Sequence, residues 1–371
     1  MKKLAIITTH PIQYYAPVFK LLAGTEQLSI KVYYTRGEET LQQFEPGFGK
    51  VISWDIPLLE DYSYQWVQAK DLTVQVATWQ PDAVLVYGWA FKGHLKCLRF
   101  FKNKIPVYFR GDSTLLNEPK WLKKLLRTLF LRWVYKHIDH AFYVGTNNKA
   151  YFKKHGLKNH QLNFAPHAID NARFEDEQES VKELRLSFNI RPDEILILYA
   201  GKFDLVKNVD LLLSAFINMN NPRAHLLLVG NGIEELNLKQ KAQQSTLSAN
   251  IHFVPFQNQS QIPAFYQASD LFCLPSTSET WGLAVNEAMA CSKAVLVADK
   301  VGCAVDLVKD GYNGWIFKAQ SLTSLTQHLT LLVNQGKDGL TQMGTNSKEI
   351  INHWTFQKQV AAIETAVIKH G

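Results

Sequence analysis

Two glutamates in the second half of the chain, Glu279 and Glu287, have the residue type and spacing to bind a ligand rich in hydroxyl groups. Seven residues separate them, and residues 283–290, directly after Gly282, are rich in helix formers. The apolar run 271–274 before them has the length of a buried strand. The pattern therefore predicts a strand, a polar loop that carries Glu279, and a helix that carries Glu287.

A strand–loop–helix unit of this kind suits a phosphorylated sugar. The first turn of a helix presents unpaired backbone N–H groups and the positive end of the helix dipole, so an anion is stabilised there. Gly282 permits close approach of a phosphate or a sugar to the backbone. Carboxylates accept hydrogen bonds from sugar hydroxyls, and Glu287 could accept them from a ribose diol. An arbitrary pair of this kind is more often a solvated helix residue and a helix-capping acid, so the interpretation depends on the rest of the chain.

A second strand-to-helix turn carries two lysines, Lys202 and Lys207. It follows the apolar run 195–200, contains Gly201, and precedes a predicted helix over residues 209–219. Two cations beside the amides of a helix N-terminus suit a pyrophosphate. This interpretation is favoured over the alternative that both are ordinary surface lysines.

Together these motifs resemble those of retaining glycosyltransferases of family four, which have the GT-B fold. The segment from Glu279 to Glu287 is similar to the E-x7-E signature of that family, and the similarity extends over nearly all of the second half and more faintly over the first. The resemblance implies that Glu279 contacts the transferred sugar, Glu287 the nucleotide ribose, and the two lysines the donor diphosphate. It also implies donor contacts around Glu279 and, near the nucleotide base, in the stretch 251–256; the residues concerned are Trp281, Gly282, Leu283, Val254 and Phe256.

The length and pattern of the chain predict an α/β protein with two domains, because 371 residues are more than one core usually supports. The resemblance implies two Rossmann-like domains facing across a cleft, with a C-terminal helix that crosses back to the first. We place the acceptor-side domain at residues 1–170 together with about 354–371, and the domain that binds the nucleotide sugar at 171–353.

The most polar strand end in the first half is Arg110-Gly111-Asp112-Ser113. The resembling family commonly has a histidine near the reacting sugar at the corresponding strand end, so the acceptor-side base stays open. Asp112 could orient or deprotonate an acceptor hydroxyl, whereas Arg110 could hold an anionic acceptor or pair with Asp112. The predicted catalytic residues are thus Glu279, Lys207, Asp112 and Arg110. His10, in the turn after the first strand, and His94, on a later helix, are candidates for contacts with the acceptor or the cleft.

Two other segments have open interpretations. Residues 36–66 form a long aromatic connection, which is either an acceptor-side loop or ordinary packing at a sheet edge. Residues 121–137 predict a basic amphipathic helix. Its basic face could contact an anionic membrane, while for its leucine face we favour ordinary packing inside the domain.

Composition narrows the class of protein. Hydrophobic residues make up 46% and charged residues 20%, which is typical of a globular chain. The net charge of +7 suits anionic partners without distinguishing nucleotides, lipids and nucleic acids. Four scattered cysteines indicate a reducing compartment, and we find neither a signal peptide nor a membrane span in the sequence. We therefore expect a cytoplasmic protein, with peripheral contact to the inner face of the membrane as an option.

The resemblance implies a hexosyltransferase-type enzyme that transfers a sugar with retained configuration. The donor would be a nucleoside diphosphate sugar, with a UDP-sugar favoured over a GDP-sugar. The acceptor would be a hydroxyl of a glycan or a lipid-linked glycan in cell-surface polysaccharide assembly. No cofactor or metal is expected, because no suitable Asp-x-Asp occurs and the lysines could stabilise the departing diphosphate. The alternatives are a nucleotide-sugar epimerase of the same fold and a non-enzymatic anion-binding module; nucleic acid is not an expected partner.

Overall fold

The computed structural model of the protein describes residues 1–45, 50–116, 121–178 and 180–370. Part of the long aromatic connection, residues 46–49, therefore lies outside the described residues, as do the side chains of Trp121 and Leu122. No helix among the described residues is long and apolar enough to cross a membrane.

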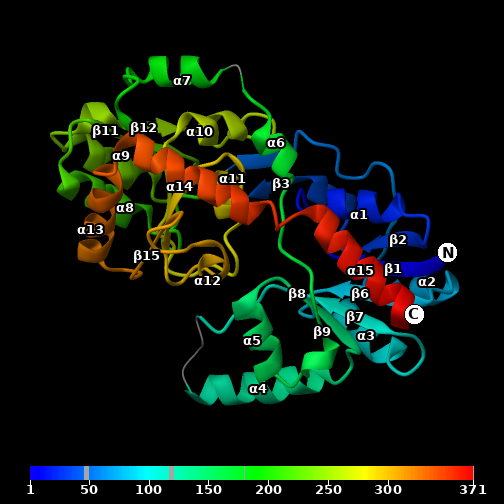
Figure 1. The fold of residues 1–371 in the computed structure, drawn as a ribbon. Coiled ribbons are helices and arrows are strands. Elements are labelled where there is room, and N and C mark those ends of the chain that lie inside the picture. Colours follow the sequence, from blue (N-terminus) through cyan, green and yellow to red (C-terminus); the bar gives the residue numbers. More distant parts are fainter. Residues whose placement is uncertain (46–49, 117–120, 179, 371) are drawn as a thin grey trace. The chain divides into compact units, whose positions relative to one another are not determined.

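The chain forms two compact α/β units, each built around its own parallel sheet (Figure 1). Unit 1 consists of Met1–Gln43, Ile56–Ala168 and Thr355–Gly371. Unit 2 consists of Phe44–Asp55 and Ile169–Trp354. The predicted fold class, two Rossmann-like α/β units, is therefore confirmed.

Unit 1 is organised around strand β1 (Lys2–Thr8), whose side chains alternate between the two faces of the sheet. Leu4 and Ile6 belong to the core on one face, and Ala5 and Ile7 to the core on the other. All four are buried, as is typical of a parallel sheet with helices on both faces.

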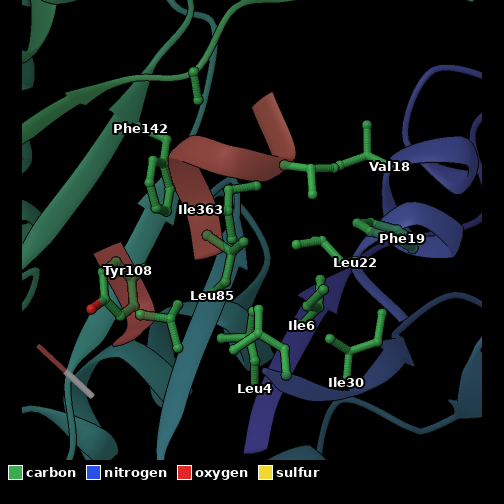
Figure 2. Packing of buried hydrophobic residues seen from close by; sticks show 14 of the residues in the cluster. Leu4, Ile6, Val18, Phe19, Leu22, Ile30, Leu85, Tyr108, Phe142 and Ile363 are labelled. Carbon is green, nitrogen blue, oxygen red and sulfur yellow. The ribbon is translucent and has the colours of Figure 1, made fainter. Parts of the chain in front are cut away.

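The first face packs against helices α1 (Ala16–Ala23) and α15 (Phe356–His370). Figure 2 shows Val18 and Phe19 of α1 and Ile363 of α15 above the strands of this core. The hydroxyl of Tyr108 donates to the carbonyl oxygen of Ala366 at 2.8 Å and ties α15 to the sheet. The prediction that the last helix returns to the first half of the chain is confirmed.

The sheet of unit 1 has the strand order β5-β2-β1-β6-β7-β8-β9 among the described residues. Its second face is covered by helices α2 to α5. The remaining elements of this unit are β2 (Leu28–Tyr34), η1 (Glu38–Leu41), β5 (Ser63–Trp66), α2 (Leu72–Thr78), β6 (Ala83–Tyr87), α3 (Lys92–Phe101), β7 (Val107–Arg110), α4 (Trp121–Tyr135), β8 (His140–Tyr143), α5 (Thr146–Lys154), η2 (Asn159–Gln161) and β9 (Leu162–Phe164).

Helix α4 departs from its predicted packing. Its buried residues are Leu131, Val134 and Tyr135, near its C-terminal end. The leucines expected to pack inside the domain are instead exposed: the exposed fractions are 51% for Leu125, 62% for Leu126 and 57% for Leu129. The prediction of an internal leucine face is therefore wrong, because only the last turns of the helix meet the core.

Unit 2 has the strand order β12-β11-β10-β13-β14-β15, and all observed pairs are parallel. Its central strand β10 (Ile195–Ala200) is buried throughout. The other elements are α6 (Asn171–Glu175), α7 (Val181–Ser187), α8 (Val209–Met219), β11 (Ala224–Val229), α9 (Glu235–Gln243), η3 (Ser248–Asn250), β12 (Ile251–Val254), α10 (Ile262–Ala268), β13 (Leu271–Leu274), α11 (Leu283–Ala290), β14 (Ala294–Ala298), α12 (Ala304–Leu307), β15 (Gly314–Phe317), α13 (Leu322–Val333) and α14 (Gly336–Ile351).

The long connection in the first half divides between the two units. Strand β5 joins the edge of the unit 1 sheet by pairing with β2. The short strands β3 (Gln42–Glu45) and β4 (Lys50–Ser53) form a separate two-stranded sheet. Residues 44–55 belong to unit 2. Packing at the edge of the unit 1 sheet is thus confirmed for β5, whereas an acceptor-side role for the connection stays a prediction.

Three neighbouring polar side chains, those of Glu194, His225 and His252, lie at the start of β10, β11 and β12. Nε2 of His225 lies 3.2 Å from Oε2 of Glu194, and Nδ1 of His225 lies 3.1 Å from Nε2 of His252. Burial, followed by the proximity of His225, lowers the pKa of His252 to about 4. The folded protein therefore holds His252 neutral at pH values where the unfolded chain binds a proton.

We expect this histidine pair to make unit 2 sensitive to acid. A lowered folded-state pKa gives stability that is fully present above pH 6.5 and is lost as the pH falls towards 4. Because His252 is only partly buried, the loss between pH 7.5 and pH 5 should be about 1 kcal/mol. Urea titrations at both pH values should show a smaller pH dependence for His252→Gln than for the wild type. His353→Gln, at an exposed site, is the control; an unchanged pH dependence in His252→Gln would contradict the assignment.

Candidate active site

The candidate donor site lies at the topological switch point of the unit 2 sheet. Strand β10 has β11 on one side and β13 on the other, so the chain leaves these strands in opposite directions. Open α/β sheets bind ligands outside the carboxyl ends of strands at such a point. The loop after β10 carries Lys202 and Lys207, and the loop after β13 carries Glu279. Two motifs that are 72 residues apart thus meet at one edge.

An ion pair joins the two loops: Nζ of Lys207 contacts Oε2 of Glu279. Their side chains are 25% and 19% exposed, so the pair is partly screened from water but reachable by a ligand. The backbone N–H of Thr277 also donates to the carbonyl oxygen of Val206 at 2.8 Å. The loops are therefore held together by backbone as well as by charge.

The beginning of the Lys207 loop is held by buried groups. The hydroxyl of Tyr199 donates to the carbonyl oxygen of Lys202 at 2.7 Å. Burial and the nearby carboxylates of Asp204 and Glu279 raise the pKa of the Tyr199 phenol well above its usual value. The backbone N–H of Lys207 donates to Oδ1 of Asp204 at 2.8 Å. These contacts to backbone groups position the beginning of the loop, in addition to the ion pair of Lys207 with Glu279.

Helix α11 begins at Gly282, which has a φ of +99°. A Cβ atom at this position would lie 2.8 Å from Cγ1 of Val301, so both backbone conformation and space require glycine. The cap residue of α11, Gly282, makes no side-chain hydrogen bond to the first turn, which begins at Leu283. The N-terminus of a helix favours an anion, so this turn is a candidate anion site.

Glu287 differs from Glu279 in its surroundings. It is only 5% exposed, and its Oε2 accepts a hydrogen bond from the Tyr266 hydroxyl at 2.8 Å. Tyr266 lies on α10, and no sequence motif pointed to it. The contact keeps the carboxylate of Glu287 in one place on α11.

Trp281 anchors the Glu279 loop through its buried side chain. Its side chain is 3% exposed, its ring packs against Trp354, and its Nε1 donates to Oδ1 of Asn286 at 3.0 Å. The indole is therefore an anchor, and a donor contact at this residue would have to come from its backbone.

The predicted base-contact residues lie at the end of β12 and on the turn after it. Val254 and Phe256 are half-buried, and the backbone N–H of Phe256 donates to Oδ1 of Asn231 at 2.9 Å. The carbonyl oxygen of Asn231 in turn accepts from the N–H of Phe203, the residue after Lys202. This turn and the lysine loop are thus joined through one asparagine at the same edge of the sheet.

In unit 1, Arg110 is a positioning residue. It is 2% exposed, and its guanidinium donates to the carbonyl oxygens of Ala165 and Pro166 at 2.9 and 3.1 Å. Its hydrogen-bonding groups hold the chain after β9, so the structure does not support a catalytic role for Arg110.

Beside Arg110 lies His167, which the sequence analysis did not include among the candidate residues. Its ring stacks on Tyr15 with centroids 6.1 Å apart, and burial, together with the charge of Arg110, lowers its pKa to about 4 against the opposing effect of Asp112. Asp112 is half-buried next to this neutral imidazole. The grouping depends on residues about 55 positions apart, which explains why no local pattern marked it.

The two other histidines have different positions. His94 is completely buried; its Nε2 lies 2.9 Å from Oγ1 of Thr35 and its Nδ1 3.1 Å from the carbonyl oxygen of Tyr87. The prediction that His94 contacts an acceptor is therefore not supported. His10 is half-buried after β1, with a pKa lowered by burial and then by Arg36. His10 keeps its predicted candidate status.

Within the residues that the structure describes, no three or more His, Cys, Asp or Glu side chains are grouped so that they could hold a metal ion.

Comparison with known proteins shows that the chain is similar to proteins named as glycosyltransferases. Residues 180–350 match the family model described as glycosyl transferases group 1. The chain is 25% identical over 366 residues to the alpha-monoglucosyldiacylglycerol synthase of Acholeplasma laidlawii, covering 93% of this chain and 90% of that protein. It is 27% identical over 205 residues to the D-inositol 3-phosphate glycosyltransferase of Segniliparus rotundus, covering 51% of this chain and 44% of that enzyme.

Solved structures have the same fold over the whole chain. A crystal structure of Anabaena HepE in complex with UDP gives a TM-score of 0.78 at 15% identity and covers 100% of both chains. Sucrose-phosphate synthase from Thermosynechococcus elongatus gives a TM-score of 0.74 at 15% identity, covering 100% of this chain and 99% of that one. These similarities confirm the GT-B fold class. The family match and the named relatives support a hexosyltransferase-type enzyme.

Gly302, which follows β14 and contacts the Glu279 loop, offers a structural test. The N–H of Gly302 donates to the carbonyl oxygen of Glu279 at 3.0 Å, and a Cβ at Gly302 would lie 1.8 Å from the carbonyl oxygen of Thr280. Gly302→Ala should therefore displace the loop and lower the stability by about 2 kcal/mol. Gly24→Ala, at a helix end where a Cβ would make only ordinary van der Waals contacts, is the matched control. Equal melting temperatures for the two variants would show that the loop is not held as described.

Proposed function

We propose that the protein transfers a sugar from a nucleoside diphosphate sugar to a hydroxyl group of a glycan or glycolipid, with retained anomeric configuration. A UDP-sugar is the favoured donor. The observation that carries the proposal is the contact between Lys207 and Glu279, which puts a cation and a carboxylate together at the switch point of unit 2. A nucleotide sugar needs both: a cation for its diphosphate and an acceptor for its hydroxyl groups.

The proposed reaction separates charge, and the proposed site would stabilise the negative charge that develops. When the bond between the sugar and the diphosphate breaks, negative charge builds on the leaving phosphate. Lys207, Lys202 and the N–H groups at the start of α11 would stabilise that charge. In this proposal these groups supply the positive charge, and neither a metal ion nor a cofactor is required.

The two glutamates have different parts in the proposal. Glu279, which a ligand can reach, accepts hydrogen bonds from the transferred sugar and orients its reacting carbon. Glu287, held by Tyr266, accepts from the ribose diol. Departure and attack on the same face of the sugar would retain the configuration without a covalent intermediate.

On the acceptor side we assign Asp112 to orient or deprotonate the attacking hydroxyl. It lies near His167, which Arg110 and burial hold neutral, so no imidazolium neutralises the carboxylate. Arg110 positions the surrounding chain, and His10 is a further candidate for acceptor contact.

The choice of donor and acceptor has support from the named relatives. One relative is named as a synthase of a glucosylated diacylglycerol, and one structure of the same fold is described as a complex with UDP and glucose. A UDP-sugar donor and a lipid or lipid-linked acceptor, in the assembly of cell-surface glycans, fit both.

A lipid acceptor would explain why part of α4 exposes apolar side chains. Leu125, Leu126 and Leu129 are exposed beside the cationic side chains of Lys123 and Arg127. Apolar side chains flanked by cations bind the interface of an anionic membrane. In the proposed function this surface brings unit 1 to the membrane that holds the acceptor, on its cytoplasmic face.

The donor assignment predicts opposite effects from the two members of the ion pair. Lys207→Ala should weaken UDP binding about tenfold or more, because a charge-assisted contact is lost and Glu279 is left beside the diphosphate. Glu279→Ala should bind UDP as well as the wild type or better, yet transfer sugar slower by on the order of 100-fold or more. Calorimetry with UDP and GDP, and product analysis with the sugar nucleotide and a glycolipid, measure these effects.

Lys241→Ala is the control for lost surface charge in unit 2, since Lys241 lies on α9 and pairs with Asp210. Parallel losses of UDP affinity in both ion-pair variants would indicate a purely structural pair and contradict the proposal. Conversion of the donor to an isomer without acceptor would instead identify an epimerase.

The membrane assignment predicts binding to vesicles of anionic phosphatidylglycerol, weakened by salt. Replacing Leu125 and Leu129 by serine should reduce co-sedimentation roughly tenfold, because two apolar side chains no longer enter the interface. Leu186→Ser is the matched control, since Leu186 is 73% exposed on unit 2. Equal binding by the double variant and the control would remove α4 from the membrane surface.

A further inference from the structure

A short segment from the first half of the chain belongs to the donor-binding unit. Residues 44–55 are part of unit 2, and residues 53–55 of this segment contact the chain after β12. The carbonyl oxygen of Ser53 accepts from Nδ2 of Asn258 at 2.7 Å. Oδ2 of Asp55 accepts from the backbone N–H of Ser260 at 3.2 Å, and the Ser260 hydroxyl contacts the same oxygen. Polar contacts therefore attach the segment on both sides of residue 54.

Between these contacts lies Trp54, whose ring meets Phe256. Their centroids are 6.2 Å apart at an interplanar angle of 69°, an edge-to-face arrangement that aromatic pairs favour. Both residues are half-buried, so part of each aromatic side chain stays accessible. Two aromatic residues that are about 200 positions apart thus form one surface.

Hydrogen bonds join this aromatic pair to the lysine loop. The side chain of Asn231 accepts from the N–H of Phe256 at 2.9 Å, and its carbonyl oxygen accepts from the N–H of Phe203, beside Lys202, at 2.9 Å. The aromatic pair is therefore two backbone contacts away from a proposed phosphate-binding residue. In a nucleoside diphosphate, one ribose separates the base from the phosphates. A surface that binds the base is therefore expected close to the residues that bind the phosphates.

We propose that Trp54 is a donor-binding residue, and that its indole forms with Phe256 the surface against which the nucleotide base packs. Every nucleobase has a flat π-face, and such faces stack on aromatic side chains. The inference rests on the proposed function, and it assigns to the first half of the chain a part in recognising the donor. Asn258 and Asp55 are positioning residues, because they hold the backbone on either side of Trp54.

The test compares ligands with and without a base. Calorimetry should show that Trp54→Ala weakens UDP binding roughly tenfold, since the packing surface for the base is lost. The same variant should bind inorganic pyrophosphate as the wild type does. Trp54→Phe should restore most of the UDP affinity, and Asp55→Ala should weaken UDP binding less than Trp54→Ala does. Trp79→Ala is the matched control, because Trp79 is half-buried in unit 1 and packs beside Lys3.

The outcomes separate the inference from the proposed function. If the wild type and Trp54→Ala bind UDP equally well, the inference is wrong and the proposed function stands. If Trp54→Ala loses UDP and pyrophosphate binding to the same extent, the segment supports the whole unit and does not recognise the base. If the wild type binds neither UDP nor GDP, both the proposed function and the inference are wrong.

Discussion

The contact between Lys207 and Glu279 is the interaction on which the candidate donor site depends, because it unites the two loops at the switch point of the unit 2 sheet. Exposed ion pairs add little stability, and burial of a pair sets a desolvation cost against its attraction. Its main effect is therefore on geometry. A cation and a carboxylate that neutralise each other can stay close together at a sheet edge without a bound ligand, at the positions where a sugar diphosphate would need them.

That geometry in turn depends on close backbone packing beneath the loops. The carbonyl oxygen of Gly201 would lie 1.9 Å from a Cβ at Gly230, and that of Thr280 would lie 1.8 Å from a Cβ at Gly302. These glycines let neighbouring loops approach until their backbones touch, so the loops cannot shift independently. Closely packed protein interiors transmit small displacements from one segment to the next. The site is consequently a property of the whole carboxyl edge of the sheet and does not belong to one motif.

Sequence reasoning succeeded where structure is local. The helix over residues 283–290, the strand over 271–274 and the helix over 209–219 follow from local composition, and the structure places all three with these bounds. It failed where the deciding partner is distant in the chain. The buried position of His94 depends on Thr35, and the hydrogen bonds of Arg110 depend on the chain after β9. The exposed leucines of α4 share a helix with buried ones, and periodicity alone cannot tell which turns meet a core.

The different burial of the two glutamates fits the order of events in the proposed reaction. Glu287 is enclosed and tied to Tyr266, so it can offer an unchanging surface to the part of the donor that does not react. Glu279 is paired with a lysine that the incoming diphosphate also attracts. A diphosphate carries more negative charge than one carboxylate, so in the proposed reaction Lys207 would be drawn from Glu279 to the phosphates as the donor binds. The carboxylate released in that exchange is the one that the sugar hydroxyls would meet, and binding of the leaving group would thereby prepare the group that orients the sugar.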